Sequence, residues 1–285
     1  MQLSGLDLGA QGVPMTLSTG KTAIVTGAST GIGRATAEAL AQRGFTVFGT
    51  SRRVTGANPK QVSLLNCDVT DDESVRGMIA SVLSRTGRID VLVNNAGIGL
   101  QGGAEESSIA QVQALFDVNL FGVIRATNAV LPAMRQRGGG RIINISSVLG
   151  LIPAPYSAHY SATKHALEGY SESLDHELRA FGIRVSLVEP AYTRSVFDQN
   201  SLPPDAPIRE YDQARRGVRS LIEDVMTTAD PPEVVAQAVL LAATTSRPRR
   251  RYPAGKVARQ ISVLRRFAPS DAFDKSLRKQ MRLPA

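Results

Sequence analysis

The chain has 285 residues, 42% of them hydrophobic, which is enough for the core of one large α/β domain. It contains no Trp and only 5% aromatic residues, which argues against a protein that stacks nucleic-acid bases. The single cysteine, Cys67, excludes an internal disulfide. No run of about 20 apolar residues indicates a membrane span, and residues 1–20 lack the features of a secretory signal, so we expect a cytoplasmic protein.

The net charge of +8 is concentrated at the C-terminus, where residues 247–285 contain 12 Lys or Arg and 2 Asp. This composition is typical of a solvated helix pair with Arg-rich outer faces. The apolar residues Val257, Ile261 and Phe267 indicate that part of the segment packs against another surface. A basic segment can also attract nucleic acid, an acidic partner or an anionic membrane. We expect no nucleic acid and at most weak peripheral membrane contact.

Short apolar runs alternate with amphipathic stretches along the chain. The apolar runs predict six strands at Thr22–Val25, Thr46–Thr50, Val62–Val69, Asp90–Val93, Arg141–Ile145 and Arg184–Val188. Helical patterns occupy 33–44, Asp72–Thr86, Ile109–Arg137 with a bend at Pro132, Ala158–Phe181 and Pro232–Ala243. The alternation predicts an α/β fold, a single Rossmann-type doubly wound parallel sheet with helices on both faces.

The same patterns predict the domain organisation. Residues 21–285 are expected to form one domain, preceded by an N-terminal extension at residues 1–20. Periodicity is absent from Tyr192 to Asp230, which is long for a loop in a compact domain. We therefore interpret residues 190–230 as a substrate loop or lid. Residues 247–285 form the basic C-terminal extension.

A glycine-rich turn from Thr26 to Gly33 joins the first predicted strand to the first predicted helix. Glycines let the backbone approach a pyrophosphate closely, and the helix N-terminus adds amide donors and a positive dipole end. The spacing is G-x-x-x-G-x-G rather than the usual dinucleotide pattern G-x-G-x-x-G. We expect the cofactor to be bound here by Gly27, Ser29, Thr30, Gly31, Ile32 and Gly33.

The second predicted strand ends in Thr50-Ser51-Arg52-Arg53. An acid at this position would hydrogen-bond the ribose 2′-hydroxyl and repel a 2′-phosphate, whereas a guanidinium group binds phosphate with two donors. Ser51, Arg52 and Arg53 therefore favour NADP(H) over NAD(H), with NAD(H) as the alternative cofactor. The other interpretation is that both arginines are solvated loop residues.

Tyr160 and Lys164 lie four residues apart on one predicted helix and therefore share a face. A phenol titrates near ~10, and a nearby ammonium favours the phenolate, which makes tyrosine a usable acid or base near neutral pH. Ser146 and Ser147 follow the fifth predicted strand, at the edge where open α/β sheets bind ligands. An ordinary helix surface pair is the alternative interpretation.

Together these motifs resemble the short-chain dehydrogenase/reductase family over roughly residues 21–243. The resemblance rests on the turn at 26–33, Asp68, Asn95-Ala96-Gly97, Asn119, Ser147, Tyr160 and Lys164, in this order. It implies that Tyr160 exchanges a proton with the substrate oxygen and that Ser147 hydrogen-bonds that oxygen. It also implies that Lys164 lowers the pKa of Tyr160 and holds the nicotinamide ribose, which Tyr160 also adjoins. Asn119 would keep a water in a proton relay behind Lys164.

The resemblance also assigns the rest of the cofactor site. Asp68 and Val69 would meet the adenine, Asn95-Ala96-Gly97 would line the adenosine side, and the nicotinamide would lie beside Pro190, Thr193 and Ser195. Pro190-Ala191 departs from the Pro-Gly of many members, and alanine fits there if its φ is negative. Thr30 stands where many NADPH-using members carry a basic residue, which weakens the preference for NADP(H).

Members of the family select substrates mainly through the segment after the Pro190 position and the C-terminus. Here that segment includes Tyr192, Val196, Phe197, Leu202, Tyr211 and Leu221. These residues predict an apolar pocket, which favours a lipophilic ketone, aldehyde or secondary alcohol. The C-terminal extension resembles that of steroid- and retinoid-handling members. The alternatives are a 3-oxoacyl thioester reductase, whose acidic carrier protein the basic segment would attract, and a catalytically weak NADP(H)-sensing protein.

The resemblance further implies a homodimer or homotetramer that pairs through the helices carrying Asn119 and Tyr160. The extension after Arg247 favours the dimer, because it could block a second interface. We expect no metal, since His159, His165 and His176 have no carboxylate at ligand spacing.

Overall fold

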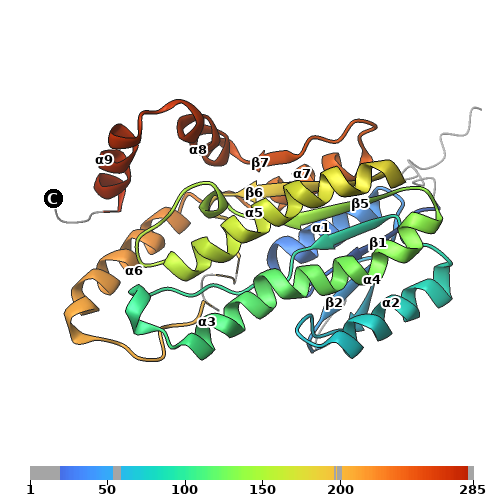
Figure 1. The fold of residues 1–285 in the computed structure, drawn as a ribbon, viewed down its shortest axis with the longest axis horizontal. Helices are drawn as coiled ribbons and strands as arrows, with labels where there is room; N and C mark the ends of the chain where they lie inside the picture. The colour runs from blue at the N-terminus through green and yellow to red at the C-terminus, as the bar shows by residue number, and fades with distance from the viewer. Residues whose placement is uncertain (1–19, 54–58, 196, 198–200, 282–285) are drawn as a thin grey trace, which may run out of the picture.

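The computed structural model describes residues 20–53, 59–195, 197 and 201–281 (Figure 1). The extension predicted at residues 1–20 lies outside these ranges except for Gly20, as does Val196 of the predicted substrate segment. The strands are β1 Thr22–Val25, β2 Thr46–Ser51, β3 Val62–Asn66, β4 Val91–Asn94, β5 Gly140–Ile145, β6 Ile183–Pro190 and β7 Arg251–Ala254. They form one sheet in the order β3-β2-β1-β4-β5-β6-β7, and every neighbouring pair is parallel.

Helices cover both faces of this sheet, which confirms the predicted fold class (Figure 1). The helices of the described residues are α1 Gly31–Gln42, α2 Asp72–Thr86, α3 Ile109–Phe116, α4 Gly122–Gln136, α5 Ala158–Leu178, α6 Asp212–Met226, α7 Pro232–Thr244, α8 Lys256–Phe267 and α9 Ser270–Gln280. Those that pack on the sheet are α1 and α7 on one face and α2, α4 and α5 on the other. Alternate residues of a strand point to opposite faces. In β1, Ala23 and Val25 enter the core under α1 and α7, while Ile24 enters the core under α2, α4 and α5.

The order of the strands creates a crevice for a ligand. The chain crosses from one half of the sheet to the other after β3, and the next strand, β4, pairs with β1. In open α/β sheets, ligands bind outside the carboxyl ends of the strands at such a switch point. The loops that follow β1 and β4 therefore meet at the candidate site.

Three predicted elements differ from the observed ones. The prediction omits β7, a four-residue edge strand that contains Pro253, and proline is tolerated in a sheet mainly at an edge. The prediction of an irregular segment from Tyr192 to Asp230 is wrong in its second half, which contains α6. The single helix predicted at Ile109–Arg137 is divided by a five-residue π turn, Asp117–Phe121, while Pro132 lies inside α4.

Other boundaries shift slightly, since helix and strand ends are the least well specified parts of an element. The third strand ends at Asn66 rather than Val69, and α1 begins at Gly31 rather than Gly33. The basic extension does contain the expected pair of helices, α8 and α9.

The helical stretch Ile109–Gln136 is long and apolar enough to span a membrane by length and composition alone. This is weak evidence for a span, because core helices of soluble proteins meet the same criterion. Its C-terminal half, α4, packs Ala126, Val130 and Met134 into the core beneath the sheet.

A buried carboxylate ties α5 to β6. Asp175 is 0% exposed and accepts hydrogen bonds from Arg184 Nε at 2.8 Å, Arg179 Nη2 at 2.5 Å and the Val185 amide at 3.0 Å. Burial opposes ionisation of this carboxyl, but the hydrogen bonds outweigh it and lower its pKa to about 2. The cluster therefore holds the end of α5 against the start of β6.

Replacing Asp175 by Asn should lower the free energy of unfolding at neutral pH by about 3 kcal/mol, because it removes the charge that both arginines pair with. The contribution is fully present above the unfolded-state pKa of 3.8 and is lost as the pH falls toward 2. Urea unfolding at several pH values measures this. Asp72→Asn, at an exposed ion pair with Arg125, is the control and should cost below about 1 kcal/mol. Equal losses in both variants would contradict the assignment.

Candidate active site

The glycine-rich turn after β1 is shaped for close approach of a ligand. Gly27 and Gly31 have φ of 65° and 53°, in the left-handed region that favours glycine. A Cβ on Gly33 would collide with the carbonyl oxygen of Gly27 and with Nδ2 of Asn95. Thr30 precedes α1 and is exposed, whereas Ile32 packs against the core, so that only its backbone faces the turn.

The loop after β4 braces this turn by hydrogen bonds. Asn95 Nδ2 donates to the carbonyl oxygens of Thr26 and Gly27, at 2.9 and 3.0 Å. Thr26 Oγ1 accepts from the amides of Asn95 and Ala96, at 2.9 and 3.0 Å. Gly97 lies against Asn119, since a Cβ on this glycine would be 3.3 Å from Asn119 Oδ1. The two loops of the switch point are thus one hydrogen-bonded unit.

Lys164 is buried at the carboxyl edge of the sheet, and its ammonium group lies beside Tyr160. Its Nζ donates to the carbonyl oxygen of Ile145, the last residue of β5, at 2.9 Å. The same Nζ is 5.6 Å from the centroid of the Tyr160 ring. Burial lowers the pKa of Lys164 to about 8, while the charge of Glu168 opposes this shift. Lys164 is therefore still largely protonated at neutral pH, beside the phenol.

Ser147 is the more accessible of the two candidate serines. It is half-buried, whereas Ser146 is 2% exposed and packs toward Gly150. Ser147 Oγ accepts from the Leu149 amide at 3.1 Å and caps the short helical turn Val148–Gly150. This hydroxyl keeps its own proton available for a substrate oxygen, because only its acceptor capacity is used in this bond.

Asn119 lies in the π turn between α3 and α4, a local helix defect that is frequent at functional sites. Its side chain exchanges two hydrogen bonds of 2.9 Å with the backbone of Ile98, and Nδ2 also lies 3.2 Å from Thr163 Oγ1. Thr163 adjoins Lys164 on α5. Asn119 therefore connects the loop after β4 to the helix that carries Tyr160 and Lys164.

The predicted adenosine end lies beyond β2 and β3. Ser51 Oγ donates to the Arg53 carbonyl oxygen at 2.9 Å, and both Arg52 and Arg53 are exposed. The pKa of Asp68 is lowered, mainly by its hydrogen bond with the Thr70 amide and, less strongly, by the charge of Arg52. Val69 is buried against Gly122 of α4. Val69 could therefore contact an adenine only through its backbone.

The segment after β6 folds back over the glycine turn. Ser195 Cβ lies 3.1 Å from the position of a Cβ on Gly31. Thr193 is 7% exposed and donates to the Ala191 carbonyl oxygen at 3.2 Å. Ala191 is not among the described residues with positive φ, so alanine fits where many relatives have glycine. Pro190, Thr193 and Ser195 thus follow one another from the sheet edge to the turn.

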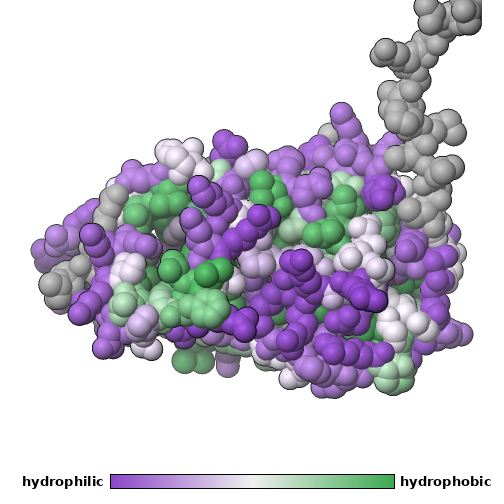
Figure 2. Space-filling model, turned by 90° about the horizontal axis from the view of Figure 1, so that it is seen from above, coloured by the Kyte–Doolittle hydropathy of each residue, from purple (hydrophilic) through white to green (hydrophobic). Residues whose placement is uncertain are grey.

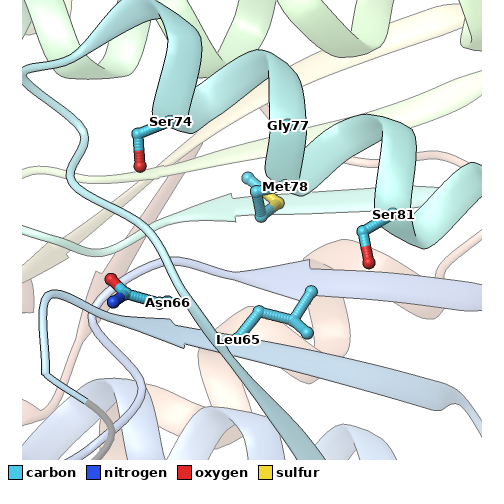
Figure 3. Close-up of a pocket in the computed structure, with 6 residues that line it drawn as sticks. All are labelled: Leu65, Asn66, Ser74, Gly77, Met78 and Ser81. Atoms are coloured by element: carbon cyan, nitrogen blue, oxygen red, sulfur yellow. The ribbon is translucent and has the colours of Figure 1, made fainter.

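Two open cavities differ in their position relative to the candidate site. One of about 360 Å³ is lined by Gly31 and Ser195, with Arg34 and Arg194 beside them. The other, of about 370 Å³, lies between β3 and α2 and includes none of the predicted site residues (Figure 3). Only the first cavity adjoins the candidate cofactor site.

A buried cluster behind Lys164 is absent from the sequence predictions. Glu189 is 0% exposed, and burial, followed by the nearby charge of Glu168, raises its pKa to about 8. Arg251 of β7 pairs with Glu189 at 3.0 Å, Glu168 at 2.9 Å and Glu172 at 2.7 Å. Glu168 lies one helical turn beyond Lys164, and this spacing is the one feature of the sequence that could have indicated the cluster. Glu172 lies on the same helix, whereas Glu189 comes from β6 and Arg251 from the unpredicted β7.

Two of the three histidines contact backbone carbonyl oxygens. His159 Nε2 lies 2.8 Å from the Ala104 carbonyl oxygen, and His165 Nδ1 lies 2.9 Å from that of Ser161. In the part of the chain that the structure describes, no three His, Cys, Asp or Glu side chains are grouped as metal ligands.

The fold and site geometry define a class of protein: an oxidoreductase with a Rossmann-type sheet and a glycine turn at the switch point. A family model described as short chain dehydrogenase matches residues 21–205. The chain therefore belongs to the short-chain dehydrogenase/reductase family, as the sequence motifs indicate. It is an enzyme that acts on an alcohol or carbonyl group.

Known members of the family are similar over most of the chain. A 3-ketodihydrosphingosine reductase of Bacteroides thetaiotaomicron is 42% identical over 198 residues, covering 70% of this chain and 73% of that protein. Estradiol 17-beta-dehydrogenase 1 of Rattus norvegicus is 36% identical over 251 residues, covering 80% and 72%. A short-chain dehydrogenase structure from Streptomyces avermitilis superposes with a TM-score of 0.76 at 36% identity, covering 92% and 96%. A metagenomic short-chain oxidoreductase in complex with NADP gives a TM-score of 0.65 at 32% identity, covering 83% and 97%.

Replacing Gly33 by Ala should weaken dinucleotide binding by at least about tenfold, because the added Cβ displaces Asn95 and the Gly27 carbonyl. Titration with NADPH measures the affinity. Gly169→Ala on α5, where no atom lies within 4 Å of the added Cβ, is the matched control. It should bind normally and gain up to about 1 kcal/mol of stability. Equal affinity in both variants would show that the turn does not contact the dinucleotide.

Proposed function

We propose that this enzyme is an NADP(H)-dependent oxidoreductase that interconverts a lipophilic ketone or aldehyde and its alcohol, with Tyr160 as acid and base. The observation that carries the proposal is the buried Lys164 ammonium, held by the Ile145 carbonyl and lying 5.6 Å from the Tyr160 ring centroid. A positive charge in a site of low dielectric stabilises the phenolate more strongly than it would in water.

The chain's residues divide the chemistry as follows. The chemistry that a bound nicotinamide cofactor would supply is hydride transfer to the carbonyl carbon or from the alcohol. During reduction Tyr160 donates its proton to the substrate oxygen, and during oxidation it takes that proton back. Ser147 donates a hydrogen bond to the same oxygen, while Lys164 stabilises the phenolate. Asn119 contacts Thr163 and so helps to hold the helix that carries Tyr160. The family resemblance implies that Asn119 also binds the water of the proton relay.

The residues present fit a dinucleotide. The turn at Gly27, Gly31 and Gly33 leaves no space for side chains and presents the N-terminus of α1, as a pyrophosphate requires. Arg52 and Arg53 are exposed at the end of β2, where they would bind a 2′-phosphate. NADP is the ligand named for three structures of similar fold, at 32%, 28% and 27% identity. These observations support NADP(H), with NAD(H) as the second cofactor.

Reversing the charge of one arginine tests the cofactor preference. Arg52→Asp should lower the ratio of kcat/KM for NADPH to kcat/KM for NADH by at least about tenfold, since an acid repels a 2′-phosphate and accepts from a 2′-hydroxyl. Arg76→Asp, at an exposed position of α2, should leave the ratio unchanged. An unaltered ratio in Arg52→Asp would overturn the assignment of this arginine.

Apolar side chains near Tyr160 support a lipophilic substrate. The Phe197 ring centroid lies 5.9 Å from that of Tyr160. Leu202, farther along the same segment, forms a backbone β-bridge with Leu100. Two similar proteins are named for a sphingoid and a steroid substrate. Tyr211, also predicted here, uses its hydroxyl to hydrogen-bond Glu105 at 2.6 Å, so that only its ring would be available.

The predicted lid is anchored rather than loose in its described part. Glu106 is 0% exposed; it accepts from the Ile208 amide at 2.8 Å and pairs with Arg215 of α6. Asp205 accepts from the Ser108 amide at 2.7 Å. We propose that this segment closes the substrate side of the site, with α6 as a fixed wall.

A panel of steroids, retinals, 3-oxoacyl thioesters and small ketones, each with NADPH and NADH, tests the substrate class. We expect the highest kcat/KM with the lipophilic carbonyl compounds, because transfer of apolar surface into the pocket contributes about 25 cal/mol per Å². Turnover confined to the thioesters would instead favour the 3-oxoacyl reductase.

The same panel with Tyr160→Phe separates an enzyme from a cofactor-sensing protein. The variant should lose most turnover, at least about a hundredfold, while NADPH titration shows unchanged binding. Unchanged turnover would remove Tyr160 from the chemistry.

Members of this family commonly form oligomers. We propose a cytoplasmic homodimer or homotetramer, paired through the helices that carry Asn119 and Tyr160. Phe121 and Phe181, at 48% and 43% exposure, offer apolar surface at two ends of that helical layer.

A further inference from the structure

The C-terminal helices α8 and α9 extend from the main body above the sheet (Figure 1). α8 follows β7 directly and has one side fixed to the protein. Its Ala258 is 0% exposed, and Arg265 Nε donates to the Leu151 carbonyl oxygen at 3.2 Å. The opposite side of this helix has no such cover among the described residues.

That opposite side carries four exposed apolar side chains, among which Lys256 and Gln260 also lie. Val257, Val263, Leu264 and Phe267 are 51%, 58%, 54% and 73% exposed. At roughly 100° per residue, the four side chains fall within an arc of about 120° that faces away from Ala258. Figure 2, seen from above the view of Figure 1, shows hydrophobic patches bordered by hydrophilic surface in the half of the molecule where α8 and α9 lie. We call this surface the outer face of α8.

Basic side chains surround the outer face. Residues 256–281 contain seven Lys or Arg and two Asp. Arg259 and Arg266 lie along one edge of the apolar arc, and Arg266 Cζ is 5.6 Å from the Phe267 ring centroid. Arg265 contacts the Phe273 ring in the same way, at 5.6 Å, and so connects α8 to α9. The result is a basic amphipathic pair of helices.

The charge of this surface selects among the partners that an apolar face can have. A second copy of the chain would bring the same excess of positive charge against it. A nucleic acid would satisfy the arginines but would leave the exposed apolar side chains in water. A bilayer with anionic headgroups satisfies both, because apolar side chains enter the acyl boundary while Lys and Arg stay among the headgroups.

We propose that α8 and α9 dock this enzyme on the surface of an anionic phospholipid bilayer, with the outer face of α8 inserted. The contact of Arg265 with Leu151 places α8 beside the turn that follows Ser147. Docking would therefore bring the substrate edge of the site close to the membrane, where lipophilic compounds are concentrated. The docking itself is independent of the proposed reaction.

Co-sedimentation of the full-length protein with vesicles tests the proposal. Vesicles of phosphatidylcholine with phosphatidylserine should bind the protein, binding should fall as salt rises, and pure phosphatidylcholine vesicles should bind it weakly. The double variant Arg259→Gln, Arg266→Gln should weaken binding on the order of 30-fold. Val263→Ser, Phe267→Ser should weaken it by at least about tenfold.

Matched variants elsewhere control for general changes in surface. Ile109→Ser alters an apolar residue on α3 that is 72% exposed, and Arg76→Gln removes an exposed charge on α2; both should bind vesicles as the parent chain does. Thermal unfolding and NADPH binding should be unchanged in all four proteins.

Other outcomes would overturn the proposal. Equal binding to vesicles with and without phosphatidylserine would remove the role of charge. Absence of vesicle binding, together with a loss of oligomer mass in Val263→Ser, Phe267→Ser, would assign the outer face to a second copy. Absence of vesicle binding together with salt-sensitive DNA binding, lost in Arg259→Gln, Arg266→Gln, would assign it to nucleic acid.

Discussion

The burial of one ammonium group is the constraint on which the arrangement of the site depends. A charge removed from water is stable only when it is hydrogen-bonded and paired. Lys164 donates a hydrogen bond to the Ile145 carbonyl at the end of β5, and the charge of Glu168, one turn along its own helix, favours the ammonium form. Because the hydrogen bond joins α5 to the sheet edge, Tyr160, one turn before Lys164, is held at the same edge. The chemistry and the packing of α5 therefore rest on the same contact.

Two asparagine side chains fix the loops of the site in place by hydrogen bonds. An amide both donates and accepts, so it can replace backbone partners where a strand or helix ends. Asn95 bonds the glycine turn, and Asn119 bonds the backbone of Ile98 from within a π turn. Without such bridges, the loops of the switch point would leave buried polar groups unpaired, at a cost of about 1–3 kcal/mol each.

The C-terminal part of the chain contributes β7, whose ion pairs lie next to Lys164 and Pro190. β7 adds Arg251, which pairs with the carboxyl groups of Glu168 and Glu172 on α5 and of Glu189 on β6. One of them, Glu189, is the residue before Pro190, where the substrate segment begins. β7 then leads into α8, so the basic extension is attached to the catalytic side of the sheet through an ion-pair cluster. The start of the extension is therefore fixed to the strands and the helix that carry the site.

The sequence by itself determined the parallel α/β fold, six of the strands and the family, because buried strands and glycine turns are encoded locally by apolar runs and spacing. It also indicated that Tyr160 and Lys164 share a helix face. Only the tertiary structure decided the seventh strand, the helix α6, the π turn at Asn119 and the Glu168–Glu189–Arg251 cluster. Each of these depends on partners distant in the chain. Among the described residues β7 pairs only with β6, and its Arg251 pairs with carboxyl groups more than sixty positions away. The pattern of residues within one segment does not specify contacts with segments so distant in the chain.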